Sequence, residues 1–201
     1  MPTFYGNSRI IEAIYAHTLD SDFIIVLADF CRANCHPEWN GAEINGVPDA
    51  CMCINEDAPG VYLNSDSDMY YVNKRVQQQV RVVLQVGTIM AMETQYLQAM
   101  ANHGGAIPDP MEWIHETLHM PHINLYQAKE GSHLCHHGHR GCLNHVVIER
   151  RRTNIDRHSL KCFNKLRCAC GASMKHPCTH DPQCLLTLEA PFCALCNAGN
   201  W

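Results

Sequence analysis

The stretch of sequence that decides the fold runs from Ser132 to Arg157 and reads SHLCHHGHRGCLNHVVIERRRTNIDR. Within it, Cys135, Cys142 and His145 offer two thiolates and an imidazole inside eleven residues. Structural zinc sites are tetrahedral and use four such ligands, so this group is one ligand short. The spacing predicts a structural zinc ion whose fourth ligand comes from elsewhere in the chain.

A second compact set of ligands lies downstream, in Cys178-x-His180-x3-Cys184. This set also holds three soft ligands, and the fourth could come from one of three nearby cysteines: Cys162, Cys168 or Cys170. Two incomplete triads, each with spare cysteines close by, predict two structural zinc ions.

Two polar residues remain once the zinc ligands are assigned. His133 lies two positions before Cys135, and Asn154 lies nine residues after His145, beyond a short apolar strand. A β-hairpin that holds a metal and leads into a helix would place a strand histidine opposite a helix asparagine. Metal-dependent phosphodiester cleavage needs this pair, because the histidine accepts a proton from the attacking water and the asparagine oxygen holds a hard divalent cation.

This sequence resembles the His-Cys box homing endonucleases, within the His-Me finger (ββα-metal) nucleases. The residues that carry the resemblance are Ser132 to Cys135, Cys142, Asn144, His145, Glu149, Asn154, Arg157 and Cys178 to Cys184. The resemblance implies an α+β fold, with a ββα-metal core stabilised by two structural zinc ions, a helix-rich N-terminal scaffold and a short β-hairpin. It also implies a DNA endonuclease that hydrolyses phosphodiester bonds with a single catalytic Mg²⁺, and a homodimer that acts on double-stranded DNA.

The family also suggests a role for each site residue. His133 would be the general base, and Asn154 the ligand of the catalytic cation. An arginine upstream of the long helix stabilises transition-state charge in the family; of Lys74 and Arg75, we assign this role to Arg75. The first zinc would take its fourth ligand from an earlier hairpin, at Cys51 or its close competitor Cys53, and we assign Cys51. The two expected zinc sets are then Cys51, Cys135, Cys142 and His145, and Cys162, Cys178, His180 and Cys184.

The sequence departs from the family pattern in three places. The loop between Cys142 and His145 is shorter than usual, and the segments from Arg75 to His133 and from Cys162 to Cys178 are longer. One alternative also stays open for the remaining cysteines. Cys168-x-Cys170 could join Cys193-x2-Cys196 in a third metal site, could share the second site, or could stay as thiols. Cys31 and Cys35 could bind metal, but cysteines on a helix more often pack as small hydrophobic residues.

Charge is distributed unevenly along the 201 residues. The net charge of −5 argues by itself against a nucleic-acid binder. Residues 1–130 carry 6 basic and 16 acidic side chains, whereas residues 131–201 carry 9 basic and 4 acidic ones and 8 of the 14 histidines. We therefore expect an acidic scaffold over 1–130 and the zinc-bound nuclease core over 131–201. Arg150, Arg151, Arg152 and Arg157 are expected to contact DNA phosphates, although a solvated charged face is the simpler interpretation.

Periodicity predicts a mostly helical scaffold upstream. The apolar run from Phe23 to Phe30 predicts a buried helix that continues towards Cys35. Residues 51–63 read as a β-hairpin with a turn at Asp57 to Gly60. A long helix is expected from about Met69, interrupted at Gly87 and followed by a second helix that reaches Met100 and ends at the glycines beyond it. A further helix is expected from Asp109, with Pro110 at its first position.

Composition excludes several classes of protein. With 46% hydrophobic and 17% charged residues, the chain is not wholly disordered. It has no apolar run of about 18 residues that could span a membrane, and its start lacks the features of a secretory signal. We therefore expect an intracellular protein, nuclear or cytoplasmic, in which cysteines bind metal and do not form disulfides. The rival to the enzyme is a zinc-stabilised nucleic-acid-binding or scaffold module with an inactive nuclease site.

Overall fold

The computed structural model describes residues 3–5, 10, 13, 16, 18–20, 22–39, 41–45, 47–66, 69–76, 80–102, 104–105, 129–138, 141–159, 162–175 and 178–190. In the N-terminal part, its elements are β1 (Thr3–Tyr5), α2 (Phe23–Ala33), β2 (Cys35–Glu38), β3 (Glu43–Ile44), β4 (Val47–Pro48), β5 (Cys51–Ile54), β6 (Val61–Asn64), β7 (Met69–Val76), β8 (Val80–Gln85) and α3 (Val86–Asn102). They are followed by β9 (Lys129–His133), β10 (Val146–Arg150), α5 (Arg151–Ser159), β11 (Lys165–Cys168), β12 (Ser173–Lys175) and β13 (Thr187–Ala190).

The largest sheet has the strand order β1-β8-β7-β6, with β1 parallel to β8 and the other neighbours antiparallel. The predicted helix from Met69 is therefore wrong over β7 and β8, and α3 begins only at Val86. The valines explain the error. Val72 and Val76 of β7 are spaced four apart, and such a spacing keeps side chains on one face of a strand as well as of a helix. Val80 begins β8 and pairs with Val76. In the structure this apolar face is buried.

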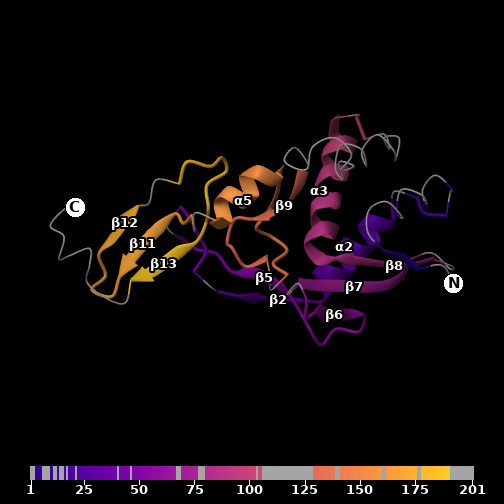
Figure 1. The fold of residues 1–201 in the computed structure, drawn as a ribbon, viewed down its shortest axis with the longest axis horizontal. Helices are drawn as coiled ribbons and strands as arrows, with labels where there is room; N and C mark the ends of the chain where they lie inside the picture. Colours follow the sequence, from indigo (N-terminus) through magenta and orange to yellow (C-terminus); the bar gives the residue numbers. More distant parts are fainter. Residues whose placement is uncertain are drawn as a thin grey trace.

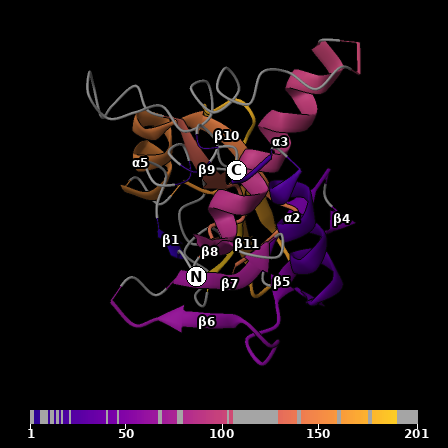
Figure 2. The same cartoon turned by 90° about the vertical axis from the view of Figure 1, so that its right-hand side faces the viewer.

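The helices α2 and α3 pack against each other and against β7, so that they cover this buried face (Figures 1 and 2). Leu27, Ile89 and Tyr96 are fully buried in the resulting core. Burying an aliphatic side chain of this size stabilises a fold by about 1.5–3 kcal/mol. Arg32 of α2 and the buried Glu93 of α3 form an ion pair that links the two helices.

The predicted ends of these helices are confirmed in part. The buried helix beginning at Phe23 is present, but it ends at Ala33, and Cys35 starts strand β2. The helix expected to reach Met100 ends at Asn102, and Gly104 and Gly105 follow it with positive φ angles of 69° and 87°. The helix expected from Asp109 lies outside the described residues.

The predicted hairpin over residues 51–63 is wrong in its pairing. Both strands exist, but β5 pairs antiparallel with β2, whereas β6 pairs with β7. Alternation and turn residues identify strands locally, but they do not determine which partner each strand finds. The pairing matters for the site, because it places Cys51 in a strand beside the zinc-ligand loop and not in an isolated hairpin.

The described residues of the segment 132–157 belong to two antiparallel strands, the loop between them and a helix. His133 of β9 lies opposite Val146 of β10, and α5 starts directly after β10. The helix α5 contacts both strands, and α3 contacts both as well. These contacts place the end of β9 between the two helices.

The C-terminal strands form a sheet of their own, with the order β12-β11-β13. Figure 1 shows this sheet at the opposite end of the molecule from β7 and β8. Glu43 of β3 is 1% exposed and forms ion pairs with Lys165 and Arg167 of β11. A backbone bridge between Ala42 and Leu186 adds a second link to the N-terminal part. Contacts thus cross the change of composition at residue 131.

No helix among the described ranges is both long and apolar enough to cross a membrane.

Candidate functional site

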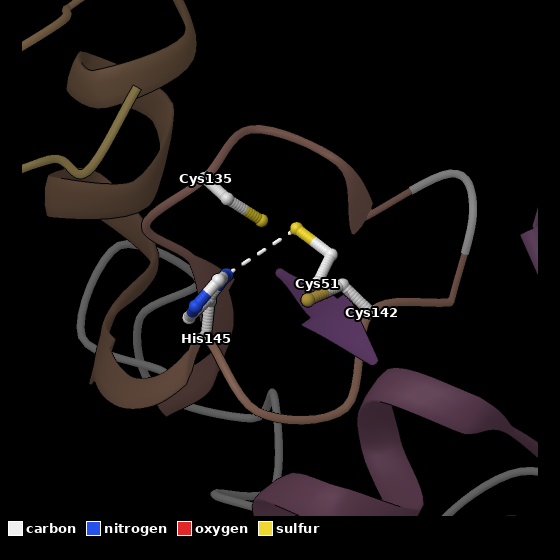
Figure 3. Close-up of side chains that lie close together, drawn as sticks. All are labelled: Cys51, Cys135, Cys142 and His145. Carbon is white, nitrogen blue, oxygen red and sulfur yellow. Dashed lines mark hydrogen bonds between the residues drawn. The ribbon is translucent and has the colours of Figure 1, made fainter. Parts of the chain in front are cut away.

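The structure brings the first expected ligand set together. One ligand atom from each of Cys51, Cys135, Cys142 and His145 lies within 4.8 Å of the others, and all four residues are buried. Figure 3 shows the three thiols and the imidazole turned towards a common centre, with Nδ1 of His145 at 3.3 Å from Sγ of Cys51. Three thiols and one imidazole are a donor set typical of structural zinc.

Backbone contacts hold this cluster in shape. Cys53 of β5 forms a β-bridge with Cys142, and the amide of Leu143 donates to the carbonyl oxygen of Met52 at 2.8 Å. The loop between β9 and β10 therefore lies against β5, and Cys51 reaches the loop from a strand more than eighty residues earlier in the chain. Cys53 is also buried beside the cluster, but its thiol is not among the four grouped ligands.

His145 is oriented by a carboxylate outside the cluster. Its Nε2 lies 2.8 Å from Oδ2 of Asp49. Because a carboxylate only accepts, Nε2 carries the proton and Nδ1 is left to bind a metal. Burial opposes protonation of the ring, but hydrogen bonds with Cys142, Cys51 and Asp49 raise the pKa of His145 to about 10. The thiols and the carboxylate around this ring thus favour a positive charge next to them, which a bound zinc ion would supply.

The thiols of this cluster shift one another's pKa values in opposite directions, and hydrogen bonds with Cys142 and Cys51 raise the pKa of Cys135. Hydrogen bonds from Cys135 and then Cys51 lower the pKa of Cys142, even though burial opposes the shift. A buried thiolate needs a nearby cation, and zinc supplies one when it is bound.

The second expected set is also brought together. Ligand atoms of Cys162, Cys178, His180 and Cys184 lie within 4.8 Å of one another. The thiol of Cys162 is 3.1 Å from that of Cys178, and the amide of Cys184 donates to the same sulfur at 3.3 Å. Burial opposes it, but this amide and the Cys162 thiol lower the pKa of Cys178 to about 6. The four residues that the structure groups are the expected ones, with Cys162 among them and without Cys168 or Cys170. Cys193 and Cys196, named for a possible third site, lie outside the described residues.

The expectation that Arg157 contacts DNA is wrong, because its side chain is fully buried. Its guanidinium donates twice to Glu149, at 2.8 and 2.9 Å, and once to the carbonyl oxygen of Pro182 at 2.8 Å. A further contact reaches Sγ of Cys184 at 3.4 Å. Arg157 therefore ties β10 and α5 to the loop of the second cluster, which a count of basic residues cannot reveal.

His136 also connects the two clusters. It follows Cys135 with a positive φ of 60°, and its Nε2 lies 3.4 Å from Sγ of Cys184. Its ring meets that of His158 edge to face, with centroids 5.2 Å apart. Burial, followed by the charges of His158 and Arg157, lowers the pKa of His136 to about 4. Another histidine of this loop, His139, lies outside the described residues.

His133 lies at the end of β9 and is 7% exposed. Its Nε2 is 3.0 Å from the carbonyl oxygen of Cys142. A carbonyl only accepts, so Nε2 carries the proton and Nδ1 holds the lone pair. Burial lowers the pKa of this histidine, and the charge of His158 on α5 lowers it further. The structure thus holds His133 neutral and in a single tautomer.

Two glycines lie beside this ring. A Cβ on Gly138 would be 2.7 Å from Nδ1 of His133, and one on Gly87 would be 3.3 Å from its Cε1. Side chains at either position would therefore crowd the imidazole. At Gly138 the missing side chain leaves room beside the nitrogen that holds the lone pair.

Asn154 lies on α5, and its Oδ1 accepts a hydrogen bond from Oγ of Ser132 at 2.8 Å. Ser132 is fully buried and directly precedes His133 on β9. The carboxamide oxygen is therefore oriented from the strand that also carries the histidine. Neither His133 nor Asn154 belongs to the two ligand clusters that the described residues form.

The structure does not bring Arg75 to this place. Arg75 pairs with Arg81, near the start of β8, whereas His133 lies next to Gly87, beyond the other end of that strand. The four residue steps from Arg81 to Gln85 span about 13 Å of strand. Gln85 is a polar residue at this end: its Nε2 and the His133 ring both lie within 4 Å of the position that a Gly87 Cβ would take. Sequence reasoning did not single out Gln85, because glutamine carries no charge.

Arg150, Arg151 and Arg152 are exposed where β10 passes into α5. Arg152 forms an exposed ion pair with Asp156 one turn further along the helix. The three arginines therefore form a basic surface at the start of α5, on the same helix as Asn154.

Comparison with known families bears on these residues. The family model for the zinc-binding loop region of homing endonucleases matches residues 65–191, which include both clusters except Cys51. A search among curated proteins finds no match to the chain. The matched segment covers more than half of the 201 residues and holds His133, Asn154 and seven of the eight grouped ligands. On this evidence the chain belongs to the family of the homing endonuclease zinc-binding loop.

Proposed function

We propose that this protein is a metal-dependent DNA endonuclease that hydrolyses phosphodiester bonds with one catalytic divalent cation, Mg²⁺. The observation that carries the proposal is the hydrogen bond from Nε2 of His133 to the carbonyl oxygen of Cys142. It leaves Nδ1 as a proton acceptor, and the lowered pKa keeps the ring neutral near pH 7. A neutral imidazole in a fixed tautomer is what a general base requires.

Asn154 is the proposed protein ligand of the catalytic cation. Mg²⁺ prefers oxygen ligands and usually keeps several waters, so a single carboxamide oxygen beside a DNA phosphate suits it. Ser132 orients this oxygen, and an amide oxygen has a second lone pair with which to contact a cation. When bound, the cation would offset negative charge on the scissile phosphate and on the leaving oxygen.

The protein side chains then have distinct tasks in hydrolysis. Nδ1 of His133 takes the proton of the attacking water, the water oxygen bonds to phosphorus, and the bond from phosphorus to the 3′ oxygen breaks. We infer that the water reaches Nδ1 beside Gly138, where a side chain would lie 2.7 Å from that nitrogen and block the approach. Gln85, in place of Arg75, would donate a hydrogen bond from Nε2 towards the phosphate.

Double-stranded DNA would be held on two surfaces. One is the basic surface of Arg150, Arg151 and Arg152. The other is the face of β7 and β8 away from the core, where Asn73 accepts from the exposed Arg81 and Arg75 lies opposite that arginine. Arginines and amides are the side chains that most often contact phosphates and base edges. That the protein works as a homodimer is proposed from the family resemblance alone.

A second candidate function is a zinc-stabilised DNA-binding module without cleavage. It is favoured by the replacement of arginine by Gln85 near His133, because a neutral amide offsets less transition-state charge than a guanidinium. The two clusters and the basic surface would serve binding equally well. Cleavage therefore has to be measured separately from binding.

The test uses a supercoiled plasmid library with a randomised insert, incubated with the full chain and Mg²⁺. We expect nicked and linear products that disappear with EDTA and return with excess Mg²⁺, and sequencing of the captured ends should define a site. His133→Ala should lose cleavage but keep DNA binding and bound zinc. The control is His36→Ala, an exposed histidine on β2, which should cleave like the parent. Binding without products in the parent chain would support the second function and reject the enzyme.

A further inference from the structure

We propose that Asn144 is a positioning residue for zinc at the first cluster, because its carboxamide holds the backbone on both sides of the ligand Cys51. Oδ1 of Asn144 accepts a hydrogen bond from the amide of Met52 at 2.8 Å, and Nδ2 donates to the carbonyl oxygen of Ala50 at 3.0 Å. Ala50 and Met52 are the two neighbours of Cys51 in the chain. One side chain therefore fixes both peptide groups that flank this ligand.

The carboxamide continues a row of backbone hydrogen bonds between β5 and the loop that precedes β10. At one end of the row, the amide of Ile54 donates to the carbonyl oxygen of Gly141 at 3.3 Å. At the next step, the amide of Leu143 donates to the carbonyl oxygen of Met52 at 2.8 Å. Residues two apart on a strand turn their backbone groups to the same side. The two hydrogen bonds of Asn144 therefore extend this row towards the start of β5.

A side chain takes over at this point because the backbone leaves the row. The next residue, His145, turns its carbonyl oxygen to the amide of Leu134 at 2.9 Å, and β10 begins directly after it. A carboxamide offers the same kinds of donor and acceptor as a peptide group, so Asn144 can replace the peptide group that has turned away. An aspartate at this position would only accept, and a leucine would do neither.

Cys51 is the ligand of the first cluster that most needs such support. It is the first residue of β5 and pairs with Glu38, the last residue of β2. The ends of an element open more readily than its middle. The other three grouped ligands lie in the loop between β9 and β10, so a complete zinc site requires β5 and this loop to stay together. Asn144 joins them at the ligand itself.

Asn144 also touches the cluster directly, although the residue is exposed. The thiol of Cys142 donates to its Oδ1 at 3.3 Å, and its Nδ2 lies 3.3 Å from Nε2 of His145. An exposed side chain contributes little to the hydrophobic core, so replacing it should leave the fold intact. A change in zinc binding after such a replacement would therefore be a local effect on the ligands.

The proposal is tested by zinc affinity, measured on the zinc-loaded full chain by titration with a chromogenic chelator. Asn144→Ala removes both hydrogen bonds, so the affinity for one zinc per chain should fall at least about tenfold, as for other groups that orient metal ligands. Asn144→Leu keeps the size of the side chain without its hydrogen bonds and should behave alike. The control is Asn55→Ala, which should bind zinc like the parent. Asn55 is also exposed, and its Oδ1 accepts from the amide of Asp57 at 3.0 Å.

A second measurement distinguishes positioning of Cys51 from a general loss of stability. The zinc-loaded chains are treated briefly with N-ethylmaleimide, and mass spectrometry locates the labelled thiols. Cys51 should react about tenfold faster in Asn144→Ala than in the parent, in step with the weaker zinc binding. Cys162 and Cys178 of the second cluster should keep the rates of the parent.

Three outcomes would overturn the proposal. The first is an Asn144→Ala or Asn144→Leu variant with the zinc affinity of the parent. The second is equally faster labelling of both clusters, which would mean that the substitution loosens the whole fold. The third is a parent chain whose first cluster binds no zinc. None of these measurements uses DNA, so they are independent of the proposed nuclease function.

Discussion

The carbonyl oxygen of Cys142 accepts a hydrogen bond from Nε2 of His133 at 3.0 Å, while the thiol of the same residue belongs to the first ligand cluster. One residue therefore links the metal cluster to the tautomer of the proposed base. A metal that fixes the backbone at Cys142 also fixes the carbonyl group that orients His133. Loss of the first zinc should for this reason disturb both the cluster and the orientation of His133.

Gly138→Ala tests the space beside Nδ1 of His133. The added methyl group would lie 2.7 Å from this nitrogen, so we expect cleavage to fall at least about tenfold, with the zinc content unchanged. The control is Gly104→Ala at the end of α3, where a Cβ meets nothing within 4 Å. Equal cleavage rates in the two variants would show that no water approaches Nδ1 from this side.

Ser132→Ala tests how Asn154 is oriented. Removing the hydroxyl leaves the carboxamide oxygen without its 2.8 Å donor, so the catalytic cation should bind more weakly. We expect the Mg²⁺ concentration for half-maximal cleavage to rise about tenfold, with a smaller change in the rate at saturating Mg²⁺. Ser132→Thr keeps the hydroxyl and should recover most of the affinity. A loss of rate that excess Mg²⁺ leaves unchanged would argue against Asn154 as the cation ligand.

Asp49→Asn should weaken zinc binding at the first cluster. The carboxylate of Asp49 holds Nε2 of His145, and loss of such a partner typically costs 10- to 100-fold in metal affinity. Competition with a chromogenic chelator should show one zinc per chain released earlier, while the second cluster is unaffected. Asp57→Asn, an exposed carboxylate on the turn before β6, serves as the control. Unchanged release in Asp49→Asn would mean that the backbone alone orients His145.

Arg157→Ala should destabilise the fold and not merely weaken DNA binding. The substitution leaves the carboxylate of Glu149, 10% exposed, without its buried partner, which typically costs 3–5 kcal/mol. Urea unfolding of the zinc-loaded protein measures this cost. Arg152→Ala on the same helix removes an exposed ion pair and should cost less than about 1 kcal/mol. Equal stability losses in the two variants would contradict the buried role of Arg157.

Cys31 should be nearly inert to alkylation in the folded protein. Burial raises the pKa of this thiol from 9.0 to about 12, so its thiolate fraction at pH 8 falls about a thousandfold. Mass spectrometry after brief iodoacetamide treatment should find Cys31 unmodified until urea is added. Because the pKa is higher in the folded state, the contribution to stability is complete below pH 9 and is lost as the pH rises towards 12. Rapid labelling of the native chain at Cys31 would contradict this.

Local sequence identified ligands more reliably than it identified sheets. Most of the ligands are separated by only a few residues, so they lie close together in space whatever fold the rest of the chain adopts. Val72 and Val76 predicted a helix, and the structure has a strand, because a four-residue spacing fits both periods. The strand at Cys51 was predicted, but its partner β2 was not, since pairing depends on contacts distant in sequence.

Sequence alone also did not predict which charged side chains are buried, or which neutral polar groups lie at the site. Arg157 carries the same charge as Arg152, and only the position of Glu149 decides that one is buried and the other exposed. The role of Cys142 towards His133 belongs to a backbone carbonyl group, which every residue possesses and no motif records. Gln85 was overlooked for a similar reason.

Glu43, wholly buried in the N-terminal part, forms ion pairs with Lys165 and Arg167 of the last sheet, just as Cys51 completes the first cluster from the same part of the chain. The portion from residue 131 onward consequently depends on residues of the N-terminal part for one ligand and for its buried ion pairs. Anyone grafting it onto a different DNA-recognition scaffold would have to carry β3 and β5 along, or supply an equivalent acid and thiol. Recombination at the change of composition would likewise separate parts that need each other.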